Sequence, residues 1–242
     1  MKFSLIVPMY NEAAIIRDTA MTLSSYMSSQ FDDYEILFSN DGSTDGCDEI
    51  VRGLNLPHVR VVGYPVNRGK GCAVRTAVMD STGDIVMFTD ADLAYGTEVI
   101  GRVAQTFVEH PEADLVIGSR NLEKDGYAEY TLLRRIASKV YIRVLCITGG
   151  FRLSDSQCGC KAFRCTAAKK IFSRCEVDGF AFDFEAILWS QKFGMKIREM
   201  PVKVINHRAS KVRVLRDTFR MLRDLRKMRK RIRRASVDGE SV

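Results

Sequence analysis

The sequence of 242 residues carries 37 Lys and Arg against 30 Asp and Glu, so its formal net charge is +7. Its length fits one large domain, or one domain with an appendage, and its 46% hydrophobic and 28% charged content excludes a largely disordered chain. No apolar run is long enough to predict a transmembrane helix, because the longest candidate, residues 136–148, contains Lys139 and Arg143.

Predicted strands and helices alternate through the first half of the chain. Apolar runs and helical spacings predict, in order, a strand at 2–9, a helix at 11–29, a strand at 34–39, a helix through Ile50, a strand at 59–63, a helix at 71–80, a strand at 85–89, a helix at 99–109 and a strand at 114–118. This alternation predicts an α/β fold with a mostly parallel sheet and right-handed crossovers.

The second half of the chain is less regular. Its patterns predict a helix near 132–147, a loop at 154–160, a helix at 182–192 and a strand at 197–204. No linker or repeat divides residues 1–207, so we expect one domain there and a separate C-terminal segment at 208–242.

Polar residues follow each of the five strands predicted in the first half. One polar strand end is usually a solvated loop, but ligands of parallel sheets bind outside the carboxyl ends of the strands, so the recurrence indicates a site. The segments are Pro8-Met9-Tyr10-Asn11-Glu12, Asn40-Asp41, Asn67-Arg68-Gly69-Lys70-Gly71, Asp90-Ala91-Asp92 and Gly118-Ser119-Arg120.

Two of these segments carry recognisable chemistry. Asp90 and Asp92 follow a buried strand, and two carboxylates at this spacing hold a divalent hard cation or meet a ribose hydroxyl, although the same pattern also occurs in solvated turns. Lys70 lies between Gly69 and Gly71, which allows close approach to a phosphate; the alternative is a glycine-rich helix start.

Taken together, these motifs resemble those of the inverting family 2 glycosyltransferases, whose members have the nucleotide-sugar-binding GT-A fold. Within that family, the second half is similar to the polyprenyl-phosphate hexosyltransferases, and to the dolichyl-phosphate glucosyltransferase branch more than the mannosyltransferase branch. The segments that carry this resemblance are Asp155-Ser156-Gln157-Cys158-Gly159-Cys160-Lys161-Ala162-Phe163, Phe182-Asp183-Phe184-Glu185, Glu199-x-Pro201-Val202 and Ser210-Lys211-Val212.

The resemblance implies a role for each matching residue. The donor nucleotide pocket corresponds to Pro8, Tyr10, Glu12, Asp41, Lys70, Asp90, Ala91 and Asp92. The metal ligands for Mg²⁺ or Mn²⁺ correspond to Asp90, Asp92 and Gln157. The acceptor phosphate corresponds to Arg120 with Arg134 or Arg135, and Asp155 is placed beside the reacting centre, so that Asp92, Asp155 and Arg120 are the expected catalytic residues. The chain departs from the family at Asn40, where an acid is usual, and at Cys160, where Phe or a similar residue is usual.

The resemblance also implies the reaction. A hexose, foremost glucose from UDP-glucose, is transferred to a polyprenyl phosphate; mannosyl transfer from GDP-mannose and the use of another UDP-sugar stay open. The leaving nucleoside diphosphate is an anion that a divalent ion neutralises. The acceptor phosphate is already a nucleophile at neutral pH, so a strong general base is less necessary than for a sugar hydroxyl.

The positive charge is concentrated near the C-terminus. Residues 208–234 hold 13 basic and 2 acidic residues, whereas residues 1–207 hold 24 basic and 26 acidic ones. Apolar residues recur every three or four positions among these charges, which predicts a basic amphipathic helix at 211–234. Such a helix binds an anionic membrane surface, binds nucleic acid, or packs on the domain or a second copy; the lipid-linked acceptor favours the membrane.

Other features of the chain bear on where it works. It begins Met-Lys-Phe-Ser without a signal-peptide pattern and has an odd number of cysteines, seven, which favours a reduced, cytoplasmic protein. We therefore expect a peripheral enzyme on the cytoplasmic face of a membrane.

A nucleic-acid-binding protein is the alternative from another class, but we expect no nucleic-acid partner because no nucleic-acid fold motif appears. The oligomeric state is left open, with a homo-oligomer among the options.

Overall fold

The structure is a computed structural model that describes residues 1–124, 142–150, 153–156, 158–205 and 214–236. Its strands are β1 (Phe3–Met9), β2 (Tyr34–Asp41), β3 (Val59–Tyr64), β4 (Ile85–Phe88), β5 (Leu115–Ser119), β6 (Lys161–Arg164) and β7 (Ile197–Pro201). Its helices are α1 (Ala13–Gln30), α2 (Cys47–Gly53), α3 (Lys70–Asp80), α4 (Glu98–Glu109), α6 (Cys165–Phe172), α7 (Phe182–Lys192) and α8 (Val214–Arg234), with a further helical stretch at 142–149.

The strands form one seven-stranded sheet in the order β3-β2-β1-β4-β6-β5-β7. All its pairings are parallel except those of β6, which runs antiparallel to both β4 and β5. The predicted α/β fold with a mostly parallel sheet is therefore confirmed. Strand β6 and helix α6 were not predicted, and the last strand ends at Pro201 rather than at the predicted residue 204.

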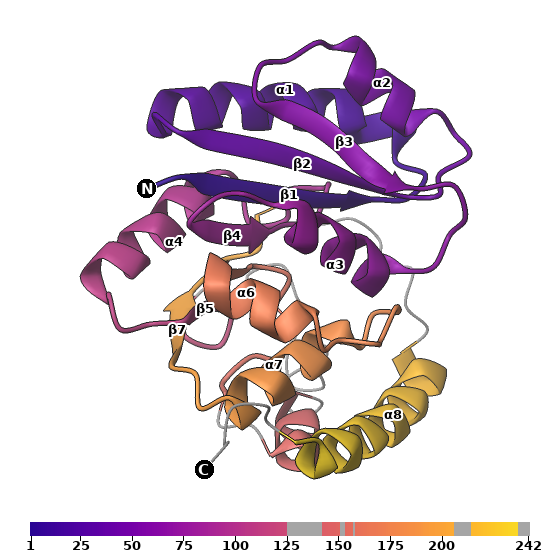
Figure 1. The fold of residues 1–242 in the computed structure, drawn as a ribbon, viewed down its shortest axis with the longest axis vertical. Coiled ribbons are helices and arrows are strands. Elements are labelled where there is room, and N and C mark those ends of the chain that lie inside the picture. Colours follow the sequence, from indigo (N-terminus) through magenta and orange to yellow (C-terminus); the bar gives the residue numbers. More distant parts are fainter. Residues whose placement is uncertain (125–141, 151–152, 157, 206–213, 237–242) are drawn as a thin grey trace.

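Helices cover both faces of the sheet and enclose two hydrophobic cores. One core joins the sheet to α1, α2 and α4, and the other joins it to α3, α6, α7, α8 and the 142–149 helix. Figure 1 shows α1 and α2 on one side of β1–β3, with α3, α6, α7 and α8 on the other. Apolar residues fill the central strands: β4, Ile-Val-Met-Phe, is buried along its whole length, as expected for a strand covered on both faces.

A buried carboxylate ties the sheet together at the edge where β1 begins. Glu35 Oε1 accepts hydrogen bonds from Ser4 Oγ at 2.6 Å and from the Thr82 N–H at 2.7 Å, and Oε2 accepts one from Arg60 at 3.0 Å. Burial by itself would raise the pKa of Glu35, but these hydrogen bonds outweigh it and lower the pKa from 4.5 to about 2.

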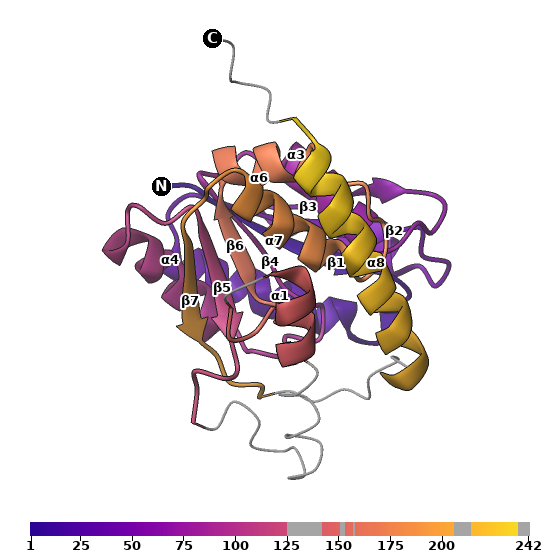
Figure 2. The ribbon, with the colours of Figure 1, turned by 90° about the horizontal axis from the view of Figure 1, so that it is seen from below.

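The C-terminal helix α8 packs against the domain. Leu225, Met228 and Ile232 recur at helical spacing and are buried in the core that includes α7, and Figure 2 shows α8 lying across α7. The expectation that the apolar stripe of this helix enters a membrane is thus corrected for these three residues, because they contact protein. No helix within the described ranges is both long enough and apolar enough to cross a bilayer.

Candidate active site

The loops that follow the strands meet at one edge of the sheet. Strands β1, β2, β4 and β5 are oriented alike, so their carboxyl ends share that edge. Strand β6 runs the other way, and its first residue, Lys161, pairs with Phe88 at the end of β4 and with Ile117 in β5. The antiparallel insertion therefore delivers a lysine to the edge where polar strand ends were predicted.

Asp90 lies beside Lys70 at this edge. The ammonium group of Lys70, the first residue of α3, donates a hydrogen bond to Asp90 Oδ1. Burial alone would lower the pKa of Lys70, but the carboxylates of Asp90 and Asp183 outweigh it and raise the pKa. The sequence placed these two residues in one nucleotide pocket, and the structure brings them together as an ion pair.

Hydrogen bonds of its backbone groups hold the loop that carries Asp90 and Asp92. Asp92 Oδ1 accepts the Ala94 N–H at 3.1 Å. Ala91, another expected donor-site residue, is buried, and its carbonyl accepts the Thr19 hydroxyl of α1 at 2.7 Å. This bond anchors the loop to the first helix, so the carboxylates on either side of Ala91 lie on a held backbone.

The carboxylates of Asp90 and Asp92 fit a small divalent cation. No cluster of three or more His, Cys, Asp and Glu side chains suited to a metal occurs in the described part of the chain, but Mg²⁺ binds through one or two carboxylates and completes its shell with water and substrate phosphate. Gly159 supports this reading: a Cβ there would lie 2.6 Å from Asp90 Oδ2, so the absence of a side chain keeps that oxygen accessible.

The two glycines beside Lys70 serve packing within the protein. A Cβ on Gly69 would lie 2.5 Å from the carbonyl oxygen of Asp178, and a Cβ on Gly71 would lie 2.4 Å from that of Val177. The N–H groups of Gly71 and Cys72 donate to the Asp178 carbonyl at 2.7 and 3.2 Å. These amides of the α3 start are therefore used internally, and Lys70 offers its ammonium group rather than a backbone cradle.

Asp41 organises the loop that precedes Lys70. It is buried, and its carboxylate accepts the Tyr64 hydroxyl at 2.7 Å, the Asn67 side-chain amide at 2.9 Å and the Gly69 N–H at 2.9 Å. Asp41, the expected base-binding residue, thus uses several of its hydrogen-bond acceptor positions for contacts within the protein. The side chain of Asn40 accepts the Ser43 N–H at 3.0 Å.

The loops after β1 and β2 bind each other. The side chain of Asn11 accepts the Thr44 N–H at 2.8 Å, and Asp45 accepts the Ala13 N–H at 2.7 Å. Asn11 has a φ of 53°, a left-handed conformation that Asn tolerates better than most residues. Of the expected base-pocket residues on the first loop, Pro8 lies in β1, Tyr10 is exposed and Glu12 precedes α1.

Arg120 and Asp155 form a buried ion pair that follows β5. The Arg120 guanidinium donates to Asp155 Oδ2 at 2.6 Å through Nε and to Oδ1 at 3.0 Å through a terminal nitrogen. Asp155 has no exposed surface, and although burial would lower the pKa of Arg120, Asp155 raises it well above its ordinary value. The structure therefore brings two of the expected catalytic residues into a forked pair, with Asp155 fixing the arginine.

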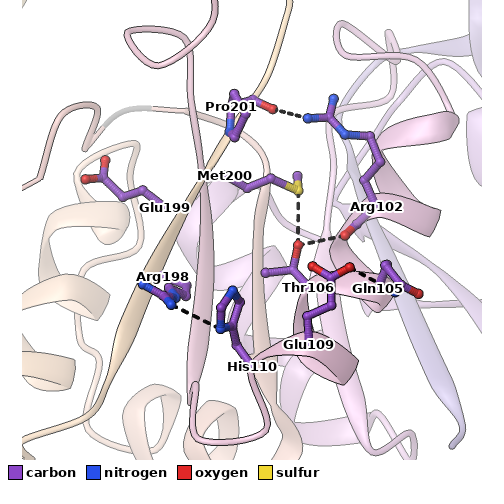
Figure 3. A pocket seen from close by; sticks show the side chains of 9 residues that line it. All are labelled: Arg102, Gln105, Thr106, Glu109, His110, Arg198, Glu199, Met200 and Pro201. Carbon is purple, nitrogen blue, oxygen red and sulfur yellow. Dashed lines mark hydrogen bonds between the residues drawn. The ribbon is translucent and has the colours of Figure 1, made fainter.

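Glu199 holds the loop that carries Asp155, a role that the sequence did not reveal. Its carboxylate accepts the Ser154 N–H at 2.8 Å and the Asp155 N–H at 3.3 Å. Figure 3 shows Glu199 turned away from Arg198 and Met200, its neighbours on β7, which face α4. The alternation of side chains along a strand explains this arrangement. A hollow of about 530 Å³ lies between α4 and β7, and Glu199 is among the residues that line it.

Lys161 and Asp183 are a second buried pair that sequence reasoning did not select. Their charged atoms lie 3.0 Å apart, and the Lys161 side chain is 1% exposed. Asp183 is the second residue of α7 and also raises the pKa of Lys70, so it lies close to the Asp90 pair. One signal was available: a lysine in the apolar run Cys160-Lys161-Ala162-Phe163 requires a partner if the run is a buried strand.

Gly159 and Tyr95 connect the two halves of the site. Gly159 lies beside Asp90, since a Cβ built on it would be 2.6 Å from Asp90 Oδ2, and its N–H donates to the Tyr95 hydroxyl at 3.3 Å. The pKa of Tyr95 is raised by burial and by the neighbouring Cys158 and Asp155, against the lowering effect of Arg120. Three expected residues, Gln157, Arg134 and Arg135, lie outside the described residues.

Comparison with known proteins identifies relatives over most of the chain. Residues 4–172 match the family model of glycosyl transferase family 2. The chain is 30% identical to the dolichyl-phosphate beta-glucosyltransferase ALG5A of Trichomonas vaginalis, over 87% of this chain and 68% of that protein. It is 29% identical to the dolichyl-phosphate beta-glucosyltransferase of Dictyostelium discoideum, over 93% of this chain and 73% of that protein.

A solved structure with the same fold is the glucosyl-3-phosphoglycerate synthase of Mycobacterium tuberculosis, crystallised with Mn²⁺, UDP and phosphoglyceric acid. The TM-score is 0.68 at 19% identity, over 100% of this chain and 81% of that one. At this identity the likeness concerns the fold, and it confirms the GT-A fold expected from the sequence.

Proposed function

The chain belongs to glycosyl transferase family 2, and from this premise we propose that it transfers glucose from UDP-glucose to a polyprenyl or dolichyl phosphate, with inversion and with Mg²⁺ or Mn²⁺. The observation that carries the proposal is its identity of about 30% to dolichyl-phosphate beta-glucosyltransferases along most of its length. The strand-end geometry supports it, since two carboxylates and a lysine lie at one end of the site and a buried arginine lies at the other.

The donor half of the site is built for a nucleoside diphosphate. Pro8, Tyr10, Glu12 and Asp41 line the base and ribose region, and Asp90 and Asp92 would hold the metal, with Gln157 as a further ligand. A divalent ion bound there supplies charge neutralisation for the departing diphosphate. Lys70 adds a positive charge at the same place, where it is already paired with Asp90.

The acceptor half is built for a phosphate monoester. Arg120, with Arg134 or Arg135, would bind the acceptor phosphate through forked hydrogen bonds, and Asp155 keeps the Arg120 guanidinium in a fixed orientation. A phosphate oxygen attacks the anomeric carbon in line with the leaving diphosphate, so one displacement converts an α-linked donor into a β-linked product. Asp155 is neutralised by Arg120, which suits a reaction that needs orientation more than a strong base.

The acceptor also sets where the enzyme works. We infer that it acts at the cytoplasmic face of a membrane, to which the basic C-terminal segment 211–234 attracts it. The relatives named for dolichyl phosphate and the cluster of basic residues in α8 support this inference.

A panel of nucleotides tests the proposal. UDP with Mn²⁺ or Mg²⁺ should raise the melting temperature, by roughly 5–10 °C at a hundredfold excess over Kd, and GDP should raise it much less. Asp92→Asn should abolish transfer from UDP-glucose and leave the unliganded melting temperature unchanged. Greater stabilisation by GDP than by UDP would favour the mannosyl branch, no response to any nucleotide would refute the enzyme assignment, and near-native turnover of the variant would refute the metal site.

A further inference from the structure

A basic groove lies between the 142–149 helix and α8, away from the residues of the active site. Five cationic side chains of α8 line it on one side, and Ile147 and Thr148 line it on the other; the α8 residues are Arg226, Arg229, Lys230, Arg233 and Arg234. The hollow has a volume of about 640 Å³ and no acidic side chain in its lining. We call it the basic groove.

The groove is held in shape by the packing of α8. Leu225, Met228 and Ile232 fix the inner side of the helix in the core. Arg231 lies on another side of the helix, where it pairs with Glu176 and with the fully buried Glu185. Arg229 then closes the base of the groove by donating to the Thr148 carbonyl at 3.0 Å.

This arrangement concentrates positive charge, and within the described residues no ion pair engages Arg226, Lys230, Arg233 or Arg234. Arg226, Lys230, Arg233 and Arg234 are exposed, whereas Arg231 and Arg229 are engaged by the protein. Like charges held close together repel one another, and an anion placed among them relieves that repulsion. Guanidinium groups in such a cluster bind phosphate oxygens by charge-assisted hydrogen bonds.

The 142–149 helix adds exposed aliphatic side chains at the groove and beside it. Ile147, which lines the groove, is 65% exposed, and Val144, one turn earlier and outside the lining, is 41% exposed, while Leu145 is fully buried. Exposed aliphatic residues beside a cluster of cations are typical of a surface that meets the headgroup region of a membrane. A surface for single-stranded nucleic acid would instead combine cations with stacking aromatic residues, and among the described residues no aromatic side chain lines this groove.

The same helix leads to the acceptor half of the active site. Its first residues, Ile142 and Arg143, line a small hollow together with Asn121 and Ser154. Asn121 donates to the Ser154 carbonyl at 2.6 Å, directly beside the pair of Arg120 and Asp155. A membrane that contacts Val144 and Ile147 would therefore present a lipid phosphate close to Arg120.

We propose that the basic groove binds the phosphate headgroups of anionic phospholipids while Val144 and Ile147 enter the interface, so that the protein docks through the outer side of α8 and not through the buried residues Leu225, Met228 and Ile232. The choice of a membrane as the occupant rests on the proposed function, whereas the presence of the groove does not depend on that function.

The test compares two variants of the full-length protein that lose equal charge from the same helix. Arg226→Gln/Lys230→Gln removes two cations of the groove, and Arg223→Gln/Lys227→Gln removes two exposed cations outside its lining. Binding is measured by flotation with phosphatidylcholine vesicles with and without phosphatidylserine, at low and high salt. We expect the groove variant to bind phosphatidylserine vesicles about 30-fold more weakly, and the control variant to lose only a few-fold.

Equal losses in the two variants would overturn the proposal, because they would assign binding to the diffuse charge of the helix. Unchanged vesicle binding, or loss of binding to a single-stranded oligonucleotide with vesicle binding retained, would also overturn it. As a second measurement, Ile147→Trp should show a blue-shifted emission with anionic vesicles only, since the natural Trp189 is buried; no shift would refute the interfacial contact of Ile147.

A detergent assay with a short-chain polyprenyl phosphate separates this proposal from the proposed function. Both charge variants should transfer glucose at the wild-type rate there, because no membrane is involved. If the wild-type protein shows no transfer while the groove variant still loses vesicle binding, the enzymatic proposal fails and the groove stands.

Discussion

Gly159→Ala should impair the active site without destabilising the fold. An added methyl group would lie 2.6 Å from Asp90 Oδ2, whereas ordinary contact begins at 3.4 Å, so the carboxylate must move by about 0.8 Å. The atom that must give way ends a flexible side chain, and Gly159 does not have a positive φ, so the melting temperature should change little. A displacement near 1 Å in a reacting constellation costs roughly 100-fold in rate, or about 2.7 kcal/mol of transition-state stabilisation.

The assay is glucosyl transfer from UDP-glucose to a polyprenyl phosphate over a range of Mn²⁺ concentrations. Gly179→Ala is the matched control, because nothing lies within 4 Å of a Cβ built there, and it should have wild-type activity. A double-mutant cycle with Asp90→Asn should be strongly non-additive if the methyl group acts through Asp90. Near-native turnover of Gly159→Ala at every Mn²⁺ concentration, or additive effects in the cycle, would show that Asp90 Oδ2 does not take part.

Three further predictions concern stability. Glu35 has a folded-state pKa of about 2 against 4.5 in the unfolded chain, so its contribution to the free energy of unfolding is fully present above pH 4.5 and is lost as the pH falls toward 2. Acid unfolding followed by circular dichroism should show that Glu35→Gln lowers the free energy of unfolding by about 3 kcal/mol at pH 7 and by less at low pH. Leu225→Ala should cost roughly 2–4 kcal/mol in urea unfolding, and no loss would mean that α8 is not packed in solution. Lys161→Met should cost roughly 3–5 kcal/mol because Asp183 is left unpaired, and adding Asp183→Asn should restore part of the loss, unless the two residues are independent.

Much of the fold could be read from hydrophobic periodicity. The helix at 182–192 and the strands of the first half have nearly the predicted bounds, because buried parallel strands are continuous apolar runs between helices. Strand β6 was not predicted because its four residues include Lys161 and Arg164, and charged residues are typical of surface positions. The strand is an interior one because it pairs with β4 and β5, and Asp183 compensates the charge of the lysine that this position buries.

The position of the candidate site could be predicted from the sequence, but the roles of its individual residues could not be predicted. A polar strand end indicates where a ligand binds, yet Asp41 and Asn11 bond largely to backbone groups of neighbouring loops. The distinction depends on which N–H groups the loops bring within 3 Å, and residue spacing does not encode that. Lys70 and Asp90 were assigned to the same pocket, but they follow β3 and β4, which are not neighbours in the sheet, so their pairing depends on the course of α3 between these strands.

The C-terminal segment shows a different limit. Amphipathic spacing predicts that one side of a helix is covered, but the same spacing serves a membrane and a protein core equally well. Leu225 and its neighbours pack on α7, so truncation after residue 207 would expose core surface as well as remove charge. Point substitutions on the outer side of α8 are therefore the sharper test of membrane binding.

The position of β6 has a consequence for synthesis on the ribosome. Strands β4 and β5 are consecutive in the sequence, yet β6 lies between them in the sheet, so neither can complete its pairing until residues 161–164 have emerged. Until then the nascent chain presents open strand edges, which are templates for wrong pairing with other chains. Because such non-local pairing is slow, these edges are where a chaperone would be needed, and slowing translation after residue 164 should improve the yield of folded protein more than slowing it before residue 115.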